Sequence, residues 1–434
     1  MKKTALVLCM LLIIVTLMPA FSASAYTPTF DINAKSSLLI NTDTGDVLYR
    51  NNTSERIYPA SLSYLMVALV ASEAAMPEDV VTVDSSVISS ISGTGAIVAN
   101  LSTDEQITMG DLMRCMLMAS DNDAALAIAA HITDTTEKFV AMMTAKAKEL
   151  NLTDTQFVTP LGLTNEQQYT TVDDLYKLSK AAMADKTISE ILSTSRYTVP
   201  ATNKSGERVL ANTNWLIDRT TSYHYKYAVS GKTANSDLSG RCLVSTASYD
   251  GANYMCIVAG CDNSENTRND FKDTINFYKW AFTSFEYKTV VNKGEQLPVS
   301  ARVDLSWSVD NITLTAGSSI VALLPKDADL STITYKVTLD NKVSDAPIAK
   351  GDKLGTASII YANETIGQVS LVSGENVERS ITLLIWRWIK NIFSNIFVII
   401  IAGVLIIAFI VLTIMANVRA SRARKKKLRL KKRL

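Results

Sequence analysis

Histidine is nearly absent from this chain, because only His131 and His224 occur among its 434 residues. A Ser-His-Asp triad or a histidine-rich metal site would have to use one of them, and neither lies beside a suitable partner motif. The sequence therefore gives no support for histidine-based hydrolysis. We expect neither a metal ion nor a cofactor.

Cysteine is also scarce, with five residues in the whole chain. Cys9 lies in the N-terminal apolar segment, Cys115 in an apolar helical stretch, and Cys242 and Cys256 in apolar strand-like runs. Together with Cys261 they match neither a disulfide framework nor a metal-type spacing. Apart from Cys9, the sequence predicts buried free thiols.

Charge is missing from an apolar run near the N-terminus. Residues 4–18 follow Lys2 and Lys3 and precede the small residues 23–25. This order is typical of a secretory signal peptide. We expect residues 1–25 to be removed by cleavage.

A second uncharged run, residues 396–416, has 21 residues. At 1.5 Å per residue a helix of this length covers roughly 31 Å, enough to cross a bilayer once. Residues 417–434 hold ten basic residues and no acidic one, so this tail should stay in the cytoplasm. Trp386 and Trp388, in the juxtamembrane segment 381–395, are expected at the membrane interface. The sequence thus predicts a single-pass protein of the cell membrane with its folded domains on the extracytoplasmic side.

The formal net charge of +1 conceals an uneven distribution. Without the ten basic residues of the tail and without Lys2 and Lys3, 31 basic residues face 42 acidic ones. The part of the chain between residue 26 and the second apolar run therefore carries a charge near −11. This sign excludes a nucleic-acid partner from our expectations, and the basic tail beside an apolar run favours a membrane.

The exported part of the chain shows two textures. From residue 26 to 286, strand-like runs mix with apolar and amphipathic helices, which predicts an α+β domain. One expected helix begins at Ser61. The other expected helices cover residues 112–118, 124–131, 139–150, 171–184 and 270–285. The expected strands of this domain cover residues 36–40, 47–49, 241–247 and 254–259. From residue 287 to 380, short alternating runs predict a small all-β domain.

Ser61 stands where an extended approach, closed by Pro59, meets a helix. A serine on the first turn of a buried helix lies where free backbone N–H groups and the helix dipole favour negative charge. That environment suits a nucleophile. A serine that only caps a core helix is the alternative interpretation.

Two further polar motifs accompany this serine. The first, Ser120-Asp121-Asn122, interrupts two apolar helical stretches, so Ser120 and Asn122 should lie on a loop facing a cleft or at a helix cap. A cap formed by Asp121 or Asn122 is the alternative. The second motif, Lys232-Thr233-Ala234, leads toward the predicted hairpin of residues 241–259, with the lysine at its entrance.

Together these three motifs resemble those of the penicillin-binding serine D-alanyl-D-alanine carboxypeptidase family, S-x-x-K, S-x-N and K-T-G. The resemblance extends over nearly the whole chain. It implies a penicillin-binding, β-lactamase-like transpeptidase domain at residues 26–286, in which helices flank an antiparallel sheet. A small β domain at 287–380 and one transmembrane helix complete the pattern. The implied partners are peptidoglycan stem peptides and β-lactam antibiotics.

The resemblance also implies a role for each motif residue. Ser61 attacks the carbonyl between two D-alanines and forms an acyl-enzyme. Ser120 relays a proton to the leaving amine, and Asn122 binds the substrate amide. Lys232 and Thr233 bind the terminal carboxylate.

Three positions depart from the family pattern. Tyr64 stands where the first motif has its lysine, and Leu161 replaces a histidine before Gly162. Ala234 replaces the glycine of the third motif, on the strand that receives the substrate. We expect the added methyl group to crowd a docked peptide without abolishing its binding.

Tyr64 leaves three hypotheses open. It acts as an unusual base, provided that nearby Lys232 favours the phenolate and lowers its pKa. Alternatively, Lys232 itself accepts the proton of Ser61. In the third hypothesis Tyr64 plugs a cleft without activity, since losing the base of a serine hydrolase costs on the order of 10⁴ to 10⁶ in rate.

The sequence thus predicts a serine-type carboxypeptidase that removes the terminal D-alanine from peptidoglycan stem peptides. The alternative is a catalytically silent relative that binds cell-wall peptide or penicillin non-covalently, or serves as an envelope or spore-coat scaffold. A β-lactamase would fit the motifs but not the appended β domain and C-terminal anchor.

Overall fold

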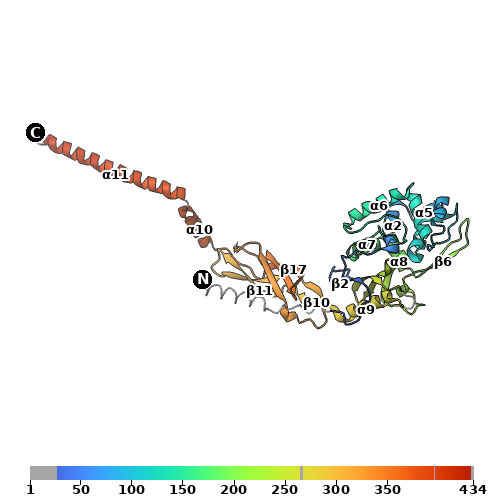
Figure 1. Ribbon diagram of the computed structural model, residues 1–434. Coiled ribbons are helices and arrows are strands. Elements are labelled where there is room, and N and C mark those ends of the chain that lie inside the picture. Colours follow the sequence, from blue (N-terminus) through green and yellow to red (C-terminus); the bar gives the residue numbers. More distant parts are fainter. Residues whose placement is uncertain (1–26, 264–266, 395, 432–434) are drawn as a thin grey trace, which may run out of the picture. The chain divides into compact units, whose positions relative to one another are not determined.

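The computed structural model of the chain describes residues 27–263, 267–394 and 396–431 (Figure 1). The predicted signal peptide, residues 1–25, lies outside the described residues. The chain divides into two compact units. The first unit extends to Glu286 and includes Leu323–Asp327, and the second unit comprises Tyr287–Ala322 and the residues from Ala328 onward.

A five-stranded antiparallel sheet forms the centre of the first unit. Its strand order is β2-β1-β9-β8-β7, so β7 is an edge strand. The strands are β1 (Ser36–Asn41), β2 (Val47–Asn51), β7 (Ala228–Ser236), β8 (Gly240–Tyr249) and β9 (Ala252–Cys261). The remaining strands of this unit form two hairpins, β3 (Val80–Thr82) with β4 (Gln106–Thr108) and β5 (Arg196–Val199) with β6 (Arg208–Ala211).

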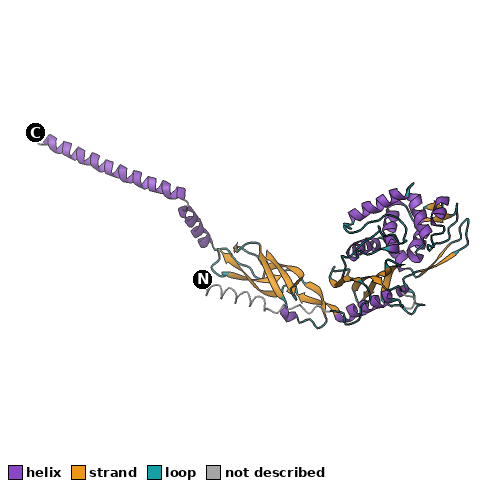
Figure 2. Ribbon diagram, viewed as in Figure 1, coloured by secondary structure: helices purple, strands orange, loops and turns teal. Residues whose placement is uncertain are grey.

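Helices lie on both faces of the central sheet (Figure 2). Helix α9 packs on β8 and β9, and α7 and α8 pack on the opposite face. Alternation along β1 matches this division, because Leu38 and Ile40 join the core beneath the helices while Leu39 points to the other face. The helices are α2 (Tyr64–Ala74), α3 (Ser85–Ile91), α4 (Met109–Arg114), α5 (Asn122–Ile132), α6 (Thr136–Glu149), α7 (Val172–Ala184), α8 (Lys186–Ser193) and α9 (Asn269–Ser284). Single helical turns occur at η1 (Ala60–Ser63), η2 (Cys115–Ala119) and η3 (Trp215–Ile217).

Helix α2 is the central helix of the first unit. Its residues Tyr64 to Ala71 are all buried, and it contacts α5, α6, α7 and α8. A helix that is apolar on every side must be surrounded by protein, and the uncharged sequence after Ser61 meets that requirement. The chain therefore presents Ser61 from the start of a rigid element.

The strands and helices predicted for the first unit are present with small shifts at their ends, and one prediction about position is wrong. Lys232 lies in the middle of β7, opposite Val244 of β8, and not at the entrance of the hairpin. The sequence did not predict β7 around Lys232, because this polar run lacks the alternation of apolar and polar residues that is typical of a half-buried strand. The expectation of buried free thiols is confirmed for Cys115, Cys242, Cys256 and Cys261.

The second unit is built on a six-stranded sheet of order β14-β16-β17-β12-β11-β15. Its strands are β11 (Gln296–Asp304), β12 (Asn311–Ala316), β14 (Thr334–Leu339), β15 (Val343–Asp345), β16 (Lys353–Tyr361) and β17 (Glu364–Ser373). The turn η4 (Leu330–Thr332) precedes β14. Two more strands, β10 (Phe285–Val291) and β13 (Ile320–Pro325), each contain residues of both units. An α+β unit followed by a β unit confirms the predicted fold class.

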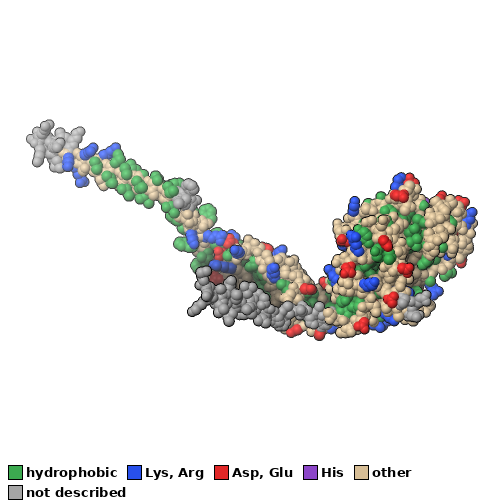
Figure 3. Space-filling model, viewed as in Figure 1, with side chains coloured by type: hydrophobic (Ala, Val, Ile, Leu, Met, Phe, Trp, Pro, Cys, Tyr) green, Lys and Arg blue, Asp and Glu red, His purple; other side chains and the backbone are tan. Residues whose placement is uncertain are grey.

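Two helices follow the β strands, α10 (Ile381–Ser394) and α11 (Ile396–Lys431). Within the described residues, α11 contains one stretch suited to crossing a membrane, Ile399–Lys425, in which an 18-residue window has a mean hydropathy of 3.1. Its apolar side chains are exposed along the helix, and basic side chains follow them (Figure 3). A long exposed apolar helix requires a nonpolar environment, which fits a membrane anchor.

A buried ion pair links the β5–β6 hairpin to the segment before β4. Glu105 is fully buried, and its carboxylate accepts hydrogen bonds from Arg208 Nη2 at 2.9 Å and Thr202 Oγ1 at 2.8 Å. Burial by itself raises the pKa of Glu105, but these hydrogen bonds outweigh it and hold the pKa below its ordinary value. Arg208 Nε also donates to the carbonyl oxygen of Ala99 at 3.0 Å.

We expect Glu105→Gln to reduce the free energy of unfolding by about 3–5 kcal/mol, because Arg208 then keeps a buried charge without its counter-ion. Glu166→Gln, at an exposed glutamate, is the matched control. The stabilisation by ionised Glu105 is complete above the pKa of an unfolded glutamate and is lost as the pH falls through the lower folded-state pKa. Urea unfolding near pH 7 and near pH 3 measures both effects. Equal urea midpoints for the two variants would contradict the prediction.

Candidate active site

Ser61 lies in η1, directly before α2. Ala60 has a φ of +44°, a conformation that residues other than glycine rarely adopt, and the N–H of Leu62 donates to the carbonyl of Pro59 at 2.9 Å. Backbone strain of this kind is concentrated at functional sites. The hydroxyl of Ser61 donates to the carbonyl oxygen of Thr233 on β7 at 3.2 Å.

Ser120 occupies the junction between η2 and α5. Its φ of +68° and ψ of +36° are left-handed, so the chain turns sharply here. The next residues hold the turn in place, because both the backbone N–H and the side-chain amide of Asn122 donate to the carbonyl of Ile97. The carboxylate of Asp123 accepts from the backbone N–H groups of Ala99 at 2.8 Å and Leu101 at 3.0 Å. A loop of fixed shape therefore presents Ser120.

Lys232 brings the three motifs together. Its side chain is completely buried, and its Nζ donates to Ser120 Oγ at 2.5 Å and to the carbonyl oxygen of Thr233 at 3.1 Å. Ser61 and Lys232 thus donate to the same carbonyl oxygen. Burial lowers the pKa of Lys232 to about 7, although the negative charge of Asp121 opposes the shift. A substantial fraction of this amine is therefore neutral at physiological pH.

Asp121 is the acidic neighbour of this lysine. It is buried, and burial followed by repulsion from Asp123 raises its pKa to about 7, while Lys232 and Arg208 act in the opposite direction. Among the described residues, its carboxylate makes no capping hydrogen bond to the first turn of α5. Asp121 is thus the N-cap residue of α5 by position, as the alternative had it, but its side chain does not form the cap, and its charge raises the pKa of Lys232.

Tyr64 fills the position of the missing motif lysine. It is fully buried, and its hydroxyl accepts a hydrogen bond from the N–H of Gly162 at 3.1 Å. The same N–H also donates to Asn122 Oδ1 at 3.1 Å. The ammonium of Lys232 lies 6.0 Å from the centre of the tyrosine ring. Burial raises the pKa of Tyr64 far above its ordinary value, and repulsion from Asp121 adds to this effect. The expectation of a lowered pKa is wrong, because the loss of solvation outweighs the hydrogen bond from Gly162.

The last two motif residues lie on β7. Thr233 Oγ1 donates to Thr213 Oγ1 at 2.6 Å, which orients the hydroxyl group beside Ser61. Ala234 pairs with Cys242 of β8, and its methyl group is buried in the hydrophobic core. Thr213 was missed in the sequence because the chain between β6 and η3 carries no motif. The N–H of Thr213 donates to the carbonyl of Met118, which ties it to the segment before Ser120.

The six motif residues Ser61, Tyr64, Ser120, Asn122, Lys232 and Thr233 therefore form one connected group in the first unit. Gly162, which follows the non-family residue Leu161, joins this group because its N–H donates to both Tyr64 and Asn122. A spacing argument could not assign this glycine, because its role depends on how the 157–163 segment folds over α2.

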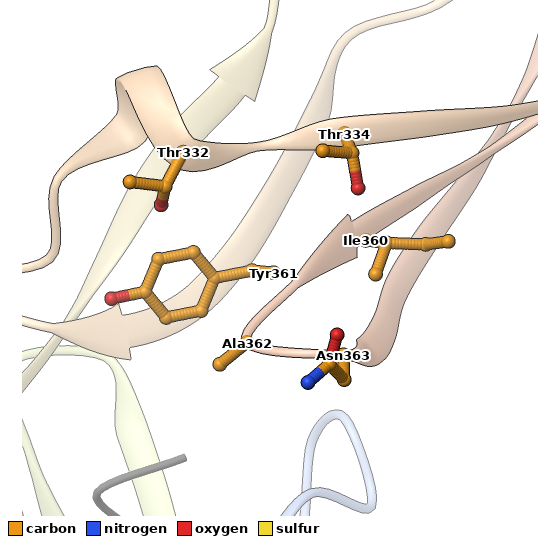
Figure 4. Close-up of a pocket in the computed structure, with 6 residues that line it drawn as sticks. All are labelled: Thr332, Thr334, Ile360, Tyr361, Ala362 and Asn363. Atoms are coloured by element: carbon orange, nitrogen blue, oxygen red, sulfur yellow. The ribbon is translucent and has the colours of Figure 1, made fainter. Parts of the chain in front are cut away.

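A different hollow of about 290 Å³ lies in the second unit (Figure 4). Its walls come from the start of β14 and the tip of the β16–β17 hairpin, and Tyr361 is the only ionisable residue among the six that line it. It lacks a nucleophile paired with a base. Within the described residues, no cluster of three or more His, Cys, Asp or Glu side chains could hold a metal ion. The chemistry of the chain is concentrated around Ser61.

Gly162 and Tyr64 offer a test of this packing. A Cβ atom at Gly162 would lie 2.7 Å from Tyr64 Cζ, 2.8 Å from its hydroxyl oxygen and 2.9 Å from the Cα of Ser61. We expect Gly162→Ala to destabilise the protein by about 1–3 kcal/mol and Tyr64→Ala to relieve part of that cost. A double-mutant cycle by urea unfolding measures the coupling. Gly206→Ala, where nothing lies within 4 Å, is the control. Strictly additive effects at positions 162 and 64 would contradict this packing.

Comparison with known proteins agrees with this geometry. Residues 21–263 match the D-alanyl-D-alanine carboxypeptidase family, and residues 285–379 match the C-terminal domain of penicillin-binding protein 5. The chain is 27% identical over 352 residues to the D-alanyl-D-alanine carboxypeptidase DacF of Bacillus subtilis, covering 80% of this chain and 86% of DacF. It is also 27% identical to DacC of Escherichia coli, over 83% of this chain and 88% of that protein.

Solved structures show the same fold. Penicillin-binding protein 5 of Haemophilus influenzae superposes with a TM-score of 0.61 at 24% identity, covering 81% of this chain and all of that chain. The carboxypeptidase DacD of Francisella tularensis gives a TM-score of 0.63 at 21% identity, over 82% and 96% of the two chains. Because the family match spans more than half of the sequence, this chain belongs to the penicillin-binding serine D-alanyl-D-alanine carboxypeptidase family.

Proposed function

We propose that the protein is an active serine carboxypeptidase that removes the terminal D-alanine from peptidoglycan stem peptides. The contact that carries the proposal is the one between Lys232 Nζ and Ser120 Oγ, next to the carbonyl of Thr233 that Ser61 also contacts. It supplies a nucleophile, a relay and a base in one connected group. The names of the relatives support the same reaction class.

Lys232 is the base in this proposal. A base must be unprotonated at working pH, and an amine with a pKa of about 7 meets that condition. Tyr64 does not meet it, because its raised pKa keeps the phenol neutral. The proton of Ser61 passes through Ser120 to Lys232, so the lysine of β7 takes over the role of the missing motif lysine.

The reaction then proceeds in two steps. Ser61 Oγ forms a bond to the carbonyl carbon between the two D-alanines, and the C–N bond breaks. The leaving amine takes the proton that Lys232 received, again through Ser120. Water later attacks the acyl carbon and passes a proton through Ser120 to Lys232. The bond between that carbon and Ser61 Oγ then breaks, Lys232 returns the proton to Ser61 Oγ by the same path, and the shortened peptide leaves as the carboxylic acid.

The edge strand β7 binds the substrate in this scheme. An edge strand offers backbone groups to an extended peptide, and Thr233 and Ala234 lie on it next to Ser61. The Thr233 hydroxyl and the positive charge of protonated Lys232 suit the terminal carboxylate of the stem peptide. Asn122 contributes a side-chain amide. β-Lactam antibiotics would acylate Ser61 by the same first step.

The location of the protein is part of the proposal. Helix α11 would cross the cell membrane once, with the basic tail in the cytoplasm and both folded units on the extracytoplasmic side. Residues 1–25 would act as the export signal. Peptidoglycan lies on that side of the membrane, so substrate and active site would share a compartment.

The second candidate function is silent binding of cell-wall peptide or penicillin. Tyr64 favours it, because the tyrosine fills the base position and its hydroxyl accepts from the N–H of Gly162 instead of contacting Ser61. Such a protein could act as an envelope scaffold. It would retain the ligand on β7 without forming an acyl-enzyme.

Incubation of the full-length protein in detergent with fluorescent penicillin, followed by intact-mass measurement, separates the two candidates. We expect one adduct, which Ser61→Ala abolishes and Lys232→Ala slows by on the order of 10⁴-fold. Thr144→Ala, on the surface of α6, is the control. A wild-type protein that never labels, while Tyr64→Lys does, would establish silent binding.

The pH dependence tests the identity of the base. We expect the acylation rate to rise as the pH increases through about 7, because only neutral Lys232 accepts a proton. Asp121→Asn should move the rise to lower pH, since the charge of Asp121 raises the pKa of Lys232. Asp250→Asn, in the exposed β8–β9 turn, should leave the profile unchanged. A rate that keeps rising above pH 9 would contradict a base with a pKa of about 7.

A further inference from the structure

A polar hollow of about 470 Å³ lies on the first unit, between α3 and the second half of α5, with the turn from α5 into α6 as its third wall. None of the ten residues that the structure describes along these walls carries a positive charge. Hydroxyl groups come from Ser86, Ser90, Thr133, Thr135 and Thr136, and carboxylates from Asp84 and Asp134. A hollow of this volume is large enough for a small ligand.

Hydrogen bonds hold the polar rim of this hollow in place. Asp84 Oδ1 accepts from the N–H of Ser86 at 2.7 Å and so caps α3. Thr135 Oγ1 accepts from the N–H of Lys138 at 3.3 Å and caps α6, while Thr133 Oγ1 donates to the carbonyl oxygen of Thr135 at 3.0 Å. A ligand would therefore meet side chains that are already oriented, which reduces the entropy lost on binding.

The two carboxylates determine which ligands fit. Hydrogen bonds from Ser86 hold the pKa of Asp84 below its ordinary value, so this group is ionised at neutral pH. Asp134 forms an ion pair with Lys138 at 2.7 Å. Fixed negative charge repels a phosphate or a free carboxylate, whereas ionised carboxylates are strong acceptors for hydroxyl donors. A neutral ligand with several hydroxyl groups therefore suits the hollow.

A small apolar patch completes the walls. It consists of Val87 on α3 and of Leu126 and Ala130 on α5. A sugar ring carries hydroxyl groups around its edge and C–H groups on its faces, and an N-acetyl group adds a methyl. Polar groups beside a limited apolar surface match both parts of such a ring. The lining therefore indicates an N-acetylated sugar.

Helix α5 connects the hollow with the candidate active site. Asn122 is the first residue of α5, and Leu126 and Ala130 follow at intervals of four residues, so the three lie on one face within an arc of about 80°. The helix rises about 12 Å from Asn122 to Ala130. Beside Asn122, whose side-chain amide donates to its carbonyl oxygen, Ile97 is 61% exposed. The hollow is thus one to two helical turns from Asn122, on the same face of α5.

The substrate of the proposed reaction has a length that matches this separation. Its terminal carboxylate would lie at Thr233 and Lys232, so the amide held by Asn122 belongs to the part of the peptide that leads back to the glycan strand. About four residues separate the carbonyl attacked by Ser61 from the sugar that carries the peptide, and they span roughly 13–14 Å when extended. A sugar in the hollow and a carbonyl at Ser61 can therefore belong to one molecule.

We propose that the hollow between α3 and α5 binds a neutral N-acetylated sugar of the glycan strand whose stem peptide occupies the site at Ser61. The inference rests on the carboxypeptidase function proposed above. Contacts with the sugar are made in the substrate complex as well as in the transition state, so they lower KM for peptides that remain attached to glycan. The enzyme thereby prefers the cell-wall polymer to released stem peptides.

Binding of tetra-N-acetylchitotetraose, a neutral chain of N-acetylated sugars, to the full-length protein in detergent tests the hollow directly. We expect Ala130→Phe, which fills the hollow, and Asp134→Asn, which removes a charged acceptor, each to weaken the affinity about tenfold by calorimetry. Ala145→Phe, exposed on α6, and Asp250→Asn are the matched controls. Equal affinity in all variants, or no binding by the wild type, would overturn the sugar site. Binding of calcium ions alone that Asp134→Asn abolishes would assign the hollow to a cation.

Hydrolysis of two substrates gives an independent readout. The KM for a disaccharide pentapeptide is compared with the KM for the same pentapeptide without sugars. We expect the wild type to have an about tenfold lower KM for the disaccharide pentapeptide, and Ala130→Phe to lose this difference. Equal KM values in the wild type would overturn the sugar site and leave the carboxypeptidase intact. Sugar binding that depends on Ala130, in a chain that hydrolyses neither substrate, would overturn the carboxypeptidase and retain the sugar site.

Discussion

The burial of one ammonium group, that of Lys232, governs the arrangement of the first unit. A lysine without solvent must find hydrogen-bond acceptors, and it finds them in Ser120 Oγ and the carbonyl of Thr233. These two contacts draw the loop before α5 and the edge strand β7 to one point beside Ser61. The rest of the unit serves to hold these pieces, through α2 behind the serine and the Asn122 and Asp123 contacts behind the loop.

Tyr64 shows how a site can change one residue and keep its shape. The phenol occupies the volume between α2 and the 157–163 segment, and the bare Cα of Gly162 accommodates it. A lysine would place a charge there, while a tyrosine places a neutral hydrogen-bond acceptor. The charge balance around Ser120 then depends mainly on Asp121, Asp123 and Lys232, and burial raises the pKa of Asp121 while it lowers that of Lys232.

The sequence predicted the elements with a clear apolar pattern and the motifs that carry chemistry. The apolar helix after Ser61 and the C-terminal span followed from long uncharged runs, and the β8–β9 hairpin from two short strand-like runs. Three features could not be read in this way: the central position of Lys232 in β7, the hydrogen bond of Thr213 and the fit of Gly162 against Tyr64. Each depends on contacts between segments far apart in the chain. In addition, burial raises the pKa of Tyr64, whereas the sequence suggested a lowered value.

The position of Lys232 has a consequence for the assembly of the sheet. An open edge such as β7 can pair with a strand from any other chain and so start aggregation. The ammonium of Lys232 gives no protection against such pairing, because it is already enclosed on the inner side of the strand with Ser120 Oγ and the carbonyl of Thr233 as its acceptors. The open edge that suits an extended peptide therefore also leaves a site where a strand of a neighbouring copy can pair.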